Sequence, residues 1–232
     1  MATEEQTCEV DTNDISAVAL VLDSGFDIRA TIDFERGDRR GAGAPLQLCD
    51  TDVLTIEGEA PTETIKASSV EYSRSLPVDA DRSITFALDR QAQGDRLELQ
   101  LELPPAFELL TPMDGDEVVL GQDLPLTWEP ARPDAIMRVR LAEPLGGGAC
   151  VGTDDTSSPS SPYKEPGGVQ VPDSGAATIA AADLRPLGAP DASCEIDITL
   201  ARVVLGAYPD AFTSGGRIEG RVERTVDLLT VR

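Results

Sequence analysis

Histidine is absent from this chain of 232 residues, and lysine is nearly so. Lys66 and Lys164 are the only lysines, and the rest of the 19 basic residues are arginines. Without an imidazole there is no serine–histidine or cysteine–histidine pair to activate a nucleophile, and no histidine ligand for a metal. Among common hydrolytic mechanisms only carboxylate chemistry remains. We therefore predict that the protein is not an enzyme and carries no cofactor.

Aromatic residues and long apolar runs are also scarce. Aromatics make up 4% of the chain, and Trp128 is the single tryptophan, so a core must be mainly aliphatic. No run of 18 apolar residues occurs, which predicts no membrane-spanning helix and no membrane insertion. The first residues, Met-Ala-Thr-Glu-Glu-Gln-Thr-Cys, contain neither a basic nor an apolar segment. If the protein is exported, we expect that its signal peptide is not present in this chain.

Acidic residues outnumber basic ones by 42 to 19, which gives a formal charge of −23. The excess is present in both halves, because residues 1–105 hold 22 acids and residues 106–232 hold 20. Phosphate binding needs clustered Lys and Arg, so nucleic acid and anionic membranes are poor partners, and we predict no nucleic-acid binding. Such an acidic surface is explained by a requirement for solubility or by an environment of high salt concentration. A surface that binds divalent cations is the alternative.

Three acidic segments are candidates for calcium binding. They are Asp79-Ala-Asp81, Asp114-Gly-Asp-Glu117 and Asp154-Asp155. None completes the Asp-x-Asp-x-Asp-Gly loop with its distal glutamate. Turn formation explains them equally well.

The four cysteines fall two in each half, Cys8 with Cys49 and Cys150 with Cys194, and none belongs to a Cys-x-x-Cys spacing. We predict one structural disulfide within each half. In the chain-entropy model, closing a loop of about 40 residues contributes at most roughly 4 kcal/mol. Disulfides persist in oxidising compartments, so this pairing predicts an extracytoplasmic location, periplasmic, cell-surface or secreted. The alternative is four buried thiols in a cytosolic protein.

Apolar and polar residues alternate along several segments. Every second residue from Phe26 to Phe34 is apolar, and the same period of two recurs over 84–88, 97–103, 137–141 and 194–200. This period is typical of half-buried strands. A sheet with one apolar face must cover it with another sheet. The sequence therefore predicts an all-β protein with two β-sandwich domains in tandem.

Prolines and glycines divide the chain. Pro104–Pro105 ends the first run of strands, so we predict an N-terminal domain, 1–105, and a C-terminal domain, 106–232. Residues 143–168 are rich in Gly, Ser and Pro and predict a long loop without an element of its own. We expect the first fourteen residues to form a loosely structured N-terminal segment that the disulfide at Cys8 attaches to the first domain.

The strands that we predict in the N-terminal domain are 15–22, 26–35, 46–49, 52–57, 64–74, 83–89 and 96–103. Those that we predict in the C-terminal domain are 107–110, 117–120, 124–128, 136–142, 168–171, 176–180, 194–204 and 217–230, and we expect a break within the last of them.

Residues 124–141, 176–186 and 194–202 together resemble a fibronectin type III domain. Residues 124–141, which begin Leu-Pro-Leu-Thr-Trp-Glu-Pro, resemble the B and C strands, whose tryptophan fills the core. Residues 176–186 resemble the E strand with its Leu-x-Pro corner, and 194–202 take the place of strand F. The resemblance covers 106–232 and implies an immunoglobulin-like sandwich, although the usual strand F tyrosine is missing. The first half resembles no family that we recognise.

In such a domain the loops gather at the two ends of the sandwich. The fold itself implies no catalytic site, so we expect the functional residues in the loops. On this topology the loops 129–134, 172–175 and 206–216 share one end. Tyr208 and Phe212 lie in the last of these, where aromatic side chains can anchor a partner. The alternative is that both pack back onto the sandwich.

These observations predict a non-enzymatic, exported or surface-associated interaction or structural module, with a protein or a cell-surface component as its partner. The alternative is an extracytoplasmic protein that binds calcium or a small polar ligand through acidic loops.

Overall fold

The computed structural model describes residues 5–37, 44–66, 69–78, 82–143, 151–152, 160–165, 167–187, 194–207 and 216–231. Over these ranges the protein is all-β, as predicted: turns and single-turn 3-10 segments connect the strands, and no α-helix occurs. None of the described segments is a helix with the length and hydrophobicity that a membrane crossing requires.

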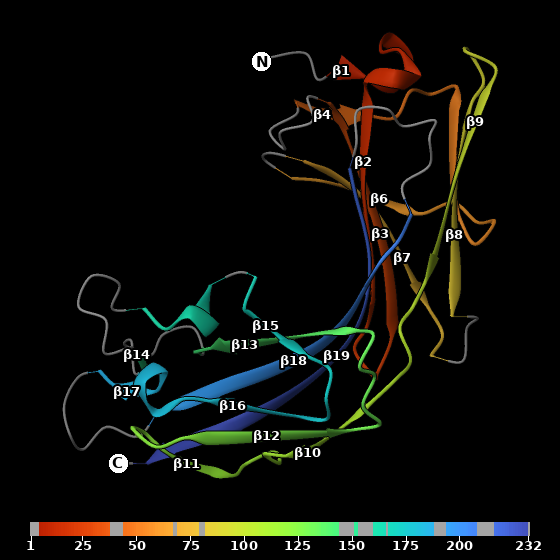
Figure 1. The fold of residues 1–232 in the computed structure, drawn as a ribbon. Helices are drawn as coiled ribbons and strands as arrows, with labels where there is room; N and C mark the ends of the chain where they lie inside the picture. Colours follow the sequence, from red (N-terminus) through yellow and green to blue (C-terminus); the bar gives the residue numbers. More distant parts are fainter. Residues whose placement is uncertain are drawn as a thin grey trace. The chain divides into compact units, whose positions relative to one another are not determined.

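The chain divides into two compact units (Figure 1). Unit 1 comprises Met1–Pro104 and Val204–Arg221, and unit 2 comprises Pro105–Val203 and Val222–Arg232. The chain thus first passes from unit 1 to unit 2 between Pro104 and Pro105. The return of residues 204–221 to unit 1 is not part of the predicted division. As a result β18 (Glu195–Leu205) and β19 (Gly216–Val231) contribute residues to both units.

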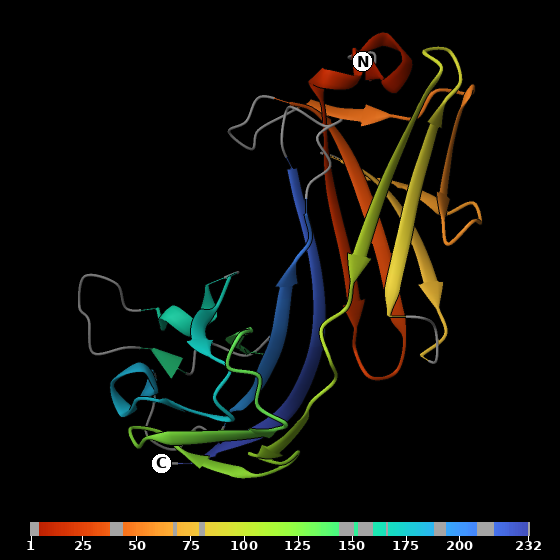
Figure 2. The ribbon, with the colours of Figure 1, turned by 45° about the vertical axis from the view of Figure 1, so that its right-hand side comes forward.

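Unit 1 contains two sheets. The small sheet is antiparallel and has the order β5 (Asp52–Ile56), β8 (Ser83–Arg90), β9 (Asp95–Glu102). Figure 2 shows β8 and β9 in front of β2 and β3, which belong to the large sheet. The large sheet has the order β6 (Thr62–Ile65), β7 (Val70–Leu76), β3 (Ile28–Arg36), β2 (Ile15–Asp23), β19, with β4 (Ala44–Gln47) on the end of β3 and β1 (Glu5–Gln6) parallel to β4.

The core of unit 1 lies between these sheets. The period of two decides which side chains face it: Ile28, Ala30, Ile32 and Phe34 of β3 are buried, while the residues between them are not. Leucines of β9 meet them from the small sheet in one continuous cluster. Because each fully buried aliphatic or aromatic side chain contributes about 1.5–3 kcal/mol, these faces hold the two sheets together.

The N-terminal segment is bonded to this core. It contains η1 (Thr7–Glu9) and η2 (Thr12–Asp14). The fully buried Arg90 donates hydrogen bonds to the carbonyl oxygens of Thr7 and Val10, both at 2.6 Å. The predicted disulfide joins Cys8 to Cys49, whose Cα atoms are 5.9 Å apart. The prediction of a loosely structured N-terminal segment is therefore wrong for residues 5–14. The buried guanidinium of Arg90 needs the carbonyl groups of this segment as hydrogen-bond acceptors.

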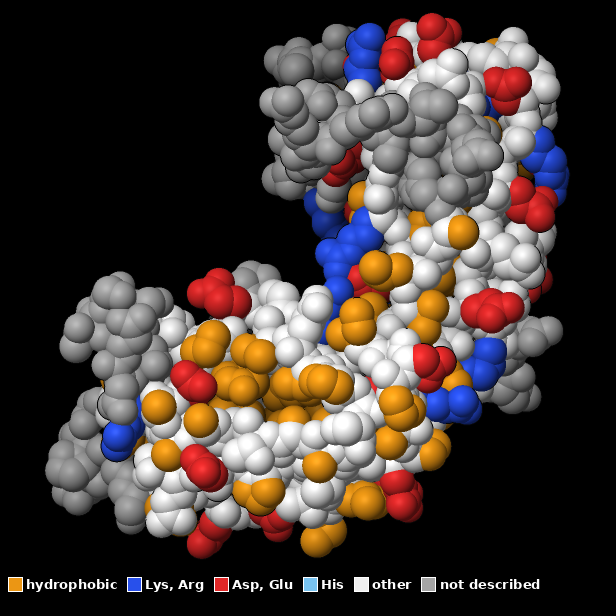
Figure 3. All heavy atoms as spheres, in the orientation of Figure 1, with side chains coloured by type: hydrophobic (Ala, Val, Ile, Leu, Met, Phe, Trp, Pro, Cys, Tyr) orange, Lys and Arg blue, Asp and Glu red, His pale blue; other side chains and the backbone are white. Residues whose placement is uncertain are grey.

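Unit 2 also contains two main sheets. One has the order β10 (Glu108–Thr111), β12 (Leu124–Glu129), β16 (Ala176–Ile179), and the other has the order β19, β18, β13 (Ile136–Ala142), β15 (Val169–Pro172). β11 (Glu117–Val119) runs parallel to the end of β19. Trp128 and Met137 are buried in one cluster with the inward residues of both sheets. Figure 3 shows hydrophobic side chains between β15 and β16, where Val169, Val171 and Ala177 pack half-buried against this core.

The region 143–168 contains elements that we did not predict. Its described residues include β14 (Val151–Gly152), which pairs with β17 (Arg185–Pro186), and η3 (Pro162–Lys164). Val151 and Tyr163 are buried in the core of unit 2. Lys164 Nζ lies 2.7 Å from Glu143 Oε2. The expectation of a loop without elements is thus wrong here, since two hydrophobic side chains in a polar stretch are enough to anchor it. The remaining single turn, η4 (Ala181–Asp183), follows β16.

Two strand predictions also need correction. The single strand predicted over 64–74 is two antiparallel strands, β6 and β7. The break expected within 217–230 does not occur, because β19 is continuous from Gly216 to Val231. Gly220 explains how it continues: a Cβ atom there would lie 2.9 Å from the carbonyl oxygen of Glu102. The glycine allows two backbones to approach closely, which is one use of glycine within a strand.

Candidate functional site

A buried ion pair lies at one end of the core of unit 2. Arg202 of β18 and Asp173, in the turn after β15, are fully buried, and Arg202 Nε donates to Asp173 Oδ2 at 2.5 Å. Trp128 Nε1 donates to the other carboxylate oxygen, Oδ1, at 2.6 Å. The terminal guanidinium nitrogens donate to the carbonyl oxygens of Pro130, at 2.6 Å, and Pro105, at 2.9 Å. Both charges are therefore compensated, as buried charges must be.

This cluster joins loops that are distant in the sequence. The turn 173–175 contains Gly175 at φ +88°, a backbone conformation that glycine adopts without strain. Trp128 N donates to the Gly175 carbonyl at 3.0 Å, and Arg132 N donates to the Asp173 carbonyl at 3.0 Å. The loops 129–134 and 172–175, which we expected at one end of the sandwich, are therefore hydrogen-bonded to each other.

Phe107 covers the ion pair from the start of unit 2. Its ring centroid lies 5.0 Å from the guanidinium carbon of Arg202 and 5.8 Å from that of Arg224. Cations at such distances from a ring face are attracted by its quadrupole. Phe107 is only 4% exposed, so a small part of its surface remains accessible.

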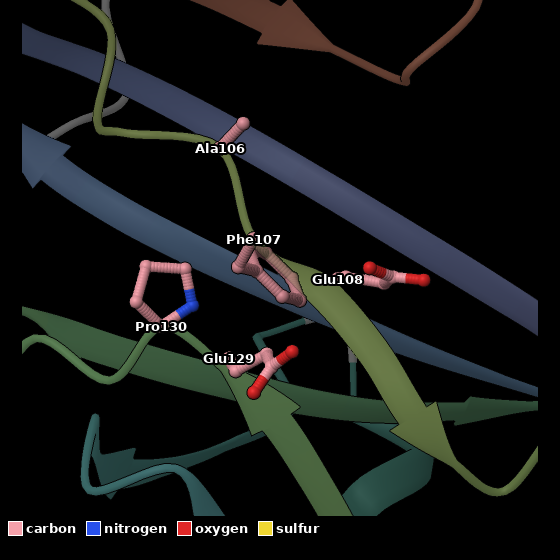
Figure 4. Close-up of a pocket in the computed structure, with 5 residues that line it drawn as sticks. All are labelled: Ala106, Phe107, Glu108, Glu129 and Pro130. Carbon is pink, nitrogen blue, oxygen red and sulfur yellow. The ribbon is translucent and has the colours of Figure 1, made fainter.

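A pocket of about 470 Å³ lies beside this ring. It is lined by Ala106, Phe107, Glu108, Glu129 and Pro130 (Figure 4). Glu108 of β10 and Glu129 of β12 are direct cross-strand partners, and both are exposed. The pocket thus combines a buried aromatic ring, an exposed proline and two carboxylates of like charge.

The pairing of the two glutamates indicates which ligand the pocket can take. Like charges directly opposite each other on an antiparallel pair are unfavourable. A cationic group between Glu108 and Glu129 would remove this repulsion and donate charge-assisted hydrogen bonds to the two carboxylates. The ring of Phe107 and the face of Pro130 offer contact to an aliphatic stem.

A second group of charges lies on the outer face of the large sheet of unit 1. Glu71 of β7 accepts hydrogen bonds from Lys66, at 2.6 Å, and Arg29, at 2.9 Å, and the bond from Lys66 is the main reason that its pKa is lowered. Asp33 lies opposite Glu71 in the register of β3 and β7. Burial, and then the charge of Glu71, raise the pKa of Asp33 to about 6. The pKa values of this pair therefore differ from those of ordinary surface carboxylates.

The predicted site residues have different outcomes. Cys8 and Cys49 form a disulfide, and Cys194 is disulfide-bonded as well, while Cys150, its expected partner, lies outside the described residues. Tyr208 and Phe212 also lie outside the described residues, so their expected role in partner contact stays a prediction.

The acidic segments proposed for calcium have ordinary roles where they are described. Asp114 Oδ1 accepts a hydrogen bond from the Asp227 amide at 3.0 Å, and Asp116 Oδ2 accepts one from the Met113 amide at 2.8 Å. The segments 79–81 and 154–155 lie outside the described residues. Across the part of the chain that the structure describes, no three His, Cys, Asp or Glu residues are grouped to hold a metal.

Sequence reasoning missed the pocket and the ion pair beneath it. Arg202 follows Ile196, Ile198 and Leu200 at the next inward position of the same period of two. A basic residue at an inward position indicates a buried cation that needs a carboxylate, and this signal was available. No sequence signal predicts that Glu108 and Glu129 lie opposite each other, because this depends on the pairing of β10 with β12.

No model of a known protein family matches the chain, and no curated protein sequence matches it. The function must therefore be inferred from the fold and the pocket.

Proposed function

We propose that the protein is a non-enzymatic interaction module that acts outside the cytoplasm, built of immunoglobulin-like β-sandwich domains. The strand order in unit 2 supports this class. The sheets β10-β12-β16 and β19-β18-β13-β15 correspond to the A-B-E and G-F-C-C′ sheets of an immunoglobulin-like sandwich. The buried Trp128 on the second strand supports the resemblance to fibronectin type III domains. The Cys8–Cys49 disulfide supports an oxidising compartment.

The pocket beside Phe107 carries the functional part of the proposal. It receives a basic side chain, arginine or lysine, from a protein partner. The two glutamates supply the charge, and the ring and Pro130 supply contact for the stem. The acidic surface of the whole chain, with a formal charge of −23, attracts such a partner over a longer range.

The test is a peptide array in which only the central residue differs between peptides, followed by calorimetry on the strongest binder. We expect peptides with central arginine or lysine to bind, and those with norleucine or glutamate not to bind. Glu108→Gln/Glu129→Gln should weaken binding about tenfold, since charged pairs at partly exposed sites are worth about 0.2–1 kcal/mol each and the two act together. Binding should also weaken as salt rises.

A matched variant controls for the loss of overall charge. Glu117→Gln/Glu195→Gln neutralises two exposed glutamates elsewhere in unit 2 and should leave binding unchanged. Equal weakening in both double variants would show that only net charge matters. Binding of norleucine peptides as strong as that of arginine peptides would refute the proposed occupant. In the part of the chain that the structure describes, no group of carboxylates favours the calcium alternative.

A further inference from the structure

Leu229 of β19 is exposed on the outer face of the sheet β19-β18-β13-β15 of unit 2. Its side chain is 44% exposed, and that of Val119 in β11 is 37% exposed on the same face. Both point away from the core, because their chain neighbours Val118 and Leu228 are buried in it. Val231 pairs with Val119 in the parallel register of β11 and β19 and is half-buried. Leu229, Val119 and Val231 form an apolar surface that we call the Leu229 patch.

Two glutamates lie on either side of Leu229. Glu117 of β11 is its partner in the parallel register. On the other side, the bond from Thr230 N to the Cys194 carbonyl, at 2.8 Å, fixes the register of β18 and β19. A hydroxyl–hydroxyl bond further along this pair, at 2.9 Å, agrees with it. The register places Glu195 of β18 opposite Leu229, so the leucine lies between two exposed glutamates.

Two aspartates add to the acidic rim of the Leu229 patch. The same register places Asp197 of β18 opposite Asp227 of β19. Burial, then the charge of Asp227 and a hydrogen bond between the two carboxyl groups, raise the pKa of Asp197, and Glu195 adds to these effects while Arg140 opposes them. Like charges directly opposite each other are unfavourable, so a cationic group stabilises this arrangement.

The carboxylates of the rim are spread out and do not converge on one point. Across the part of the chain that the structure describes, no three acidic, His or Cys side chains are grouped to hold a metal ion. Neighbouring strands lie about 4.8 Å apart, so the backbones of Glu117 and Glu195, one strand away from β19 on each side, are about 10 Å apart. Two separate cations with an apolar group between them match this spacing. In an extended peptide, alternate side chains point the same way about 6.7 Å apart.

We propose that the Leu229 patch binds an extended segment of a basic protein partner, in which a large aliphatic residue lies between two arginines at alternate positions. The aliphatic side chain contacts the patch, and the guanidinium groups donate hydrogen bonds to Glu117 and Glu195. An apolar centre with a polar rim is typical of protein–protein contacts. The patch belongs to β11, β18 and β19, whereas β10, β12 and the residues adjoining them line the pocket beside Phe107. The two sites are therefore independent.

The test is calorimetry of the full chain with the capped peptide Ser-Arg-Ser-Leu-Ser-Arg-Ser at low ionic strength. One control peptide has serine in place of leucine. The other, Arg-Arg-Ser-Leu-Ser-Ser-Ser, has the same composition with both arginines on one side. We expect the first peptide to bind at least about tenfold more tightly than either control, since only it offers both contacts together. Nuclear magnetic resonance mapping should place its amide shifts on residues 117–119, 195–197 and 227–231.

A pair of leucine variants tests the apolar centre. Leu229→Ser should weaken binding of the first peptide about tenfold, because it removes the central apolar contact. Leu110→Ser changes another exposed leucine of unit 2, on β10, and should leave binding unchanged. Circular dichroism confirms that each variant is folded.

A pair of charge variants separates this surface from the pocket. Glu117→Gln/Glu195→Gln should weaken binding of the first peptide about tenfold. Glu108→Gln/Glu129→Gln, which alters the pocket, should leave it unchanged. The reverse result would place the peptide in the pocket, which overturns this proposal and leaves the proposed function standing.

Three further results overturn the proposal. They are equal binding of all three peptides, an affinity that Leu229→Ser leaves unchanged, and amide shifts confined to other surfaces. Self-association of the chain that Leu229→Ser abolishes also overturns it, since the occupant would then be a second copy. Analytical ultracentrifugation without peptide detects that case.

Discussion

Among the residues that the structure describes, two arginines are fully buried, one in each unit, and each holds segments that are far apart in the sequence. Arg90 binds the carbonyl groups of Thr7 and Val10, and Arg202 binds Asp173 and the loop carbonyls around it. Both occupy the next inward position after a row of apolar residues. A guanidinium offers five donors in a fixed plane, so it can satisfy several acceptors where a lysine could not.

Replacement of Arg202 should destabilise unit 2. Arg202→Met leaves the buried carboxylate of Asp173 without its cation, which typically costs about 3–5 kcal/mol. Trp128, the single tryptophan, belongs to unit 2 and is hydrogen-bonded to the same carboxylate, so its fluorescence during urea unfolding reports on this unit. Arg132→Met, at an exposed arginine of the adjacent loop, should change the stability by less than about 0.5 kcal/mol. A loss of the same size in both variants would contradict the account.

The carboxyl of Asp33 should make unit 1 less stable as pH rises. Its pKa is 3.8 when unperturbed and about 6 in the folded protein, where burial and the charges of Glu71 and Glu35 outweigh Lys66. Between these values the folded state keeps a proton that the unfolded state has released, so the free energy of unfolding falls. Asp33→Asn should therefore be more stable than the wild type above about pH 6, and the difference should vanish below about pH 4.

Calorimetric melting of both proteins across this pH range measures the effect. Asp50→Asn, at an exposed aspartate of unit 1, serves as the control and should follow the wild-type curve. A stability difference for Asp33→Asn that does not change with pH would show that burial of this carboxyl is not responsible.

At the scale of the elements, the sequence predicted most strands because one buried face imposes a period of two. β8, β13 and β16 lie within one or two residues of their predicted ranges. The errors are at positions where periodicity carries no information. β6 is exposed along its whole length, so its separation from β7 left no pattern. The break that we expected within 217–230 does not occur, and Gly220 in this segment allows a close approach between backbones.

Replacement of Gly220 in β19 should destabilise the protein. Gly220→Ala places a Cβ atom 2.9 Å from the Glu102 carbonyl oxygen, so backbone must move, at a cost of about 1–3 kcal/mol. Gly167→Ala is the matched control, because a Cβ atom there meets nothing within 4 Å. Thermal unfolding should show a lower melting temperature for the first variant only. An unchanged melting temperature in Gly220→Ala would mean that β19 and residues 102–104 are not in close contact.

At the scale of the whole molecule, composition indicated the class of protein better than it indicated the site. The alternation of apolar and polar residues along the strands predicted an all-β protein, and the scarcity of aromatic residues predicted an aliphatic core. The pocket could not be predicted, because Phe107 and Glu129 are separated by a β11 that belongs to the other sheet. The register of β10 against β12 brings them together, and the sequence does not encode that register in any local pattern.

The disulfides provide a prediction for the whole chain. Thiol titration of the unreduced, denatured protein should detect no reactive thiol, and four reactive thiols would contradict an oxidising location. Cys8→Ala/Cys49→Ala should lower the free energy of unfolding of unit 1 by up to about 4 kcal/mol, given the separation of 41 residues.

The central claim is that a rigid all-β scaffold binds a basic side chain at the pocket of unit 2. Nuclear magnetic resonance mapping of the full chain with an arginine peptide from the array tests this most directly. The account predicts that amide shifts concentrate on residues 106–108 and on Glu129, and that the norleucine peptide causes none there. Shifts confined to other surfaces, or equal shifts with both peptides, would contradict it.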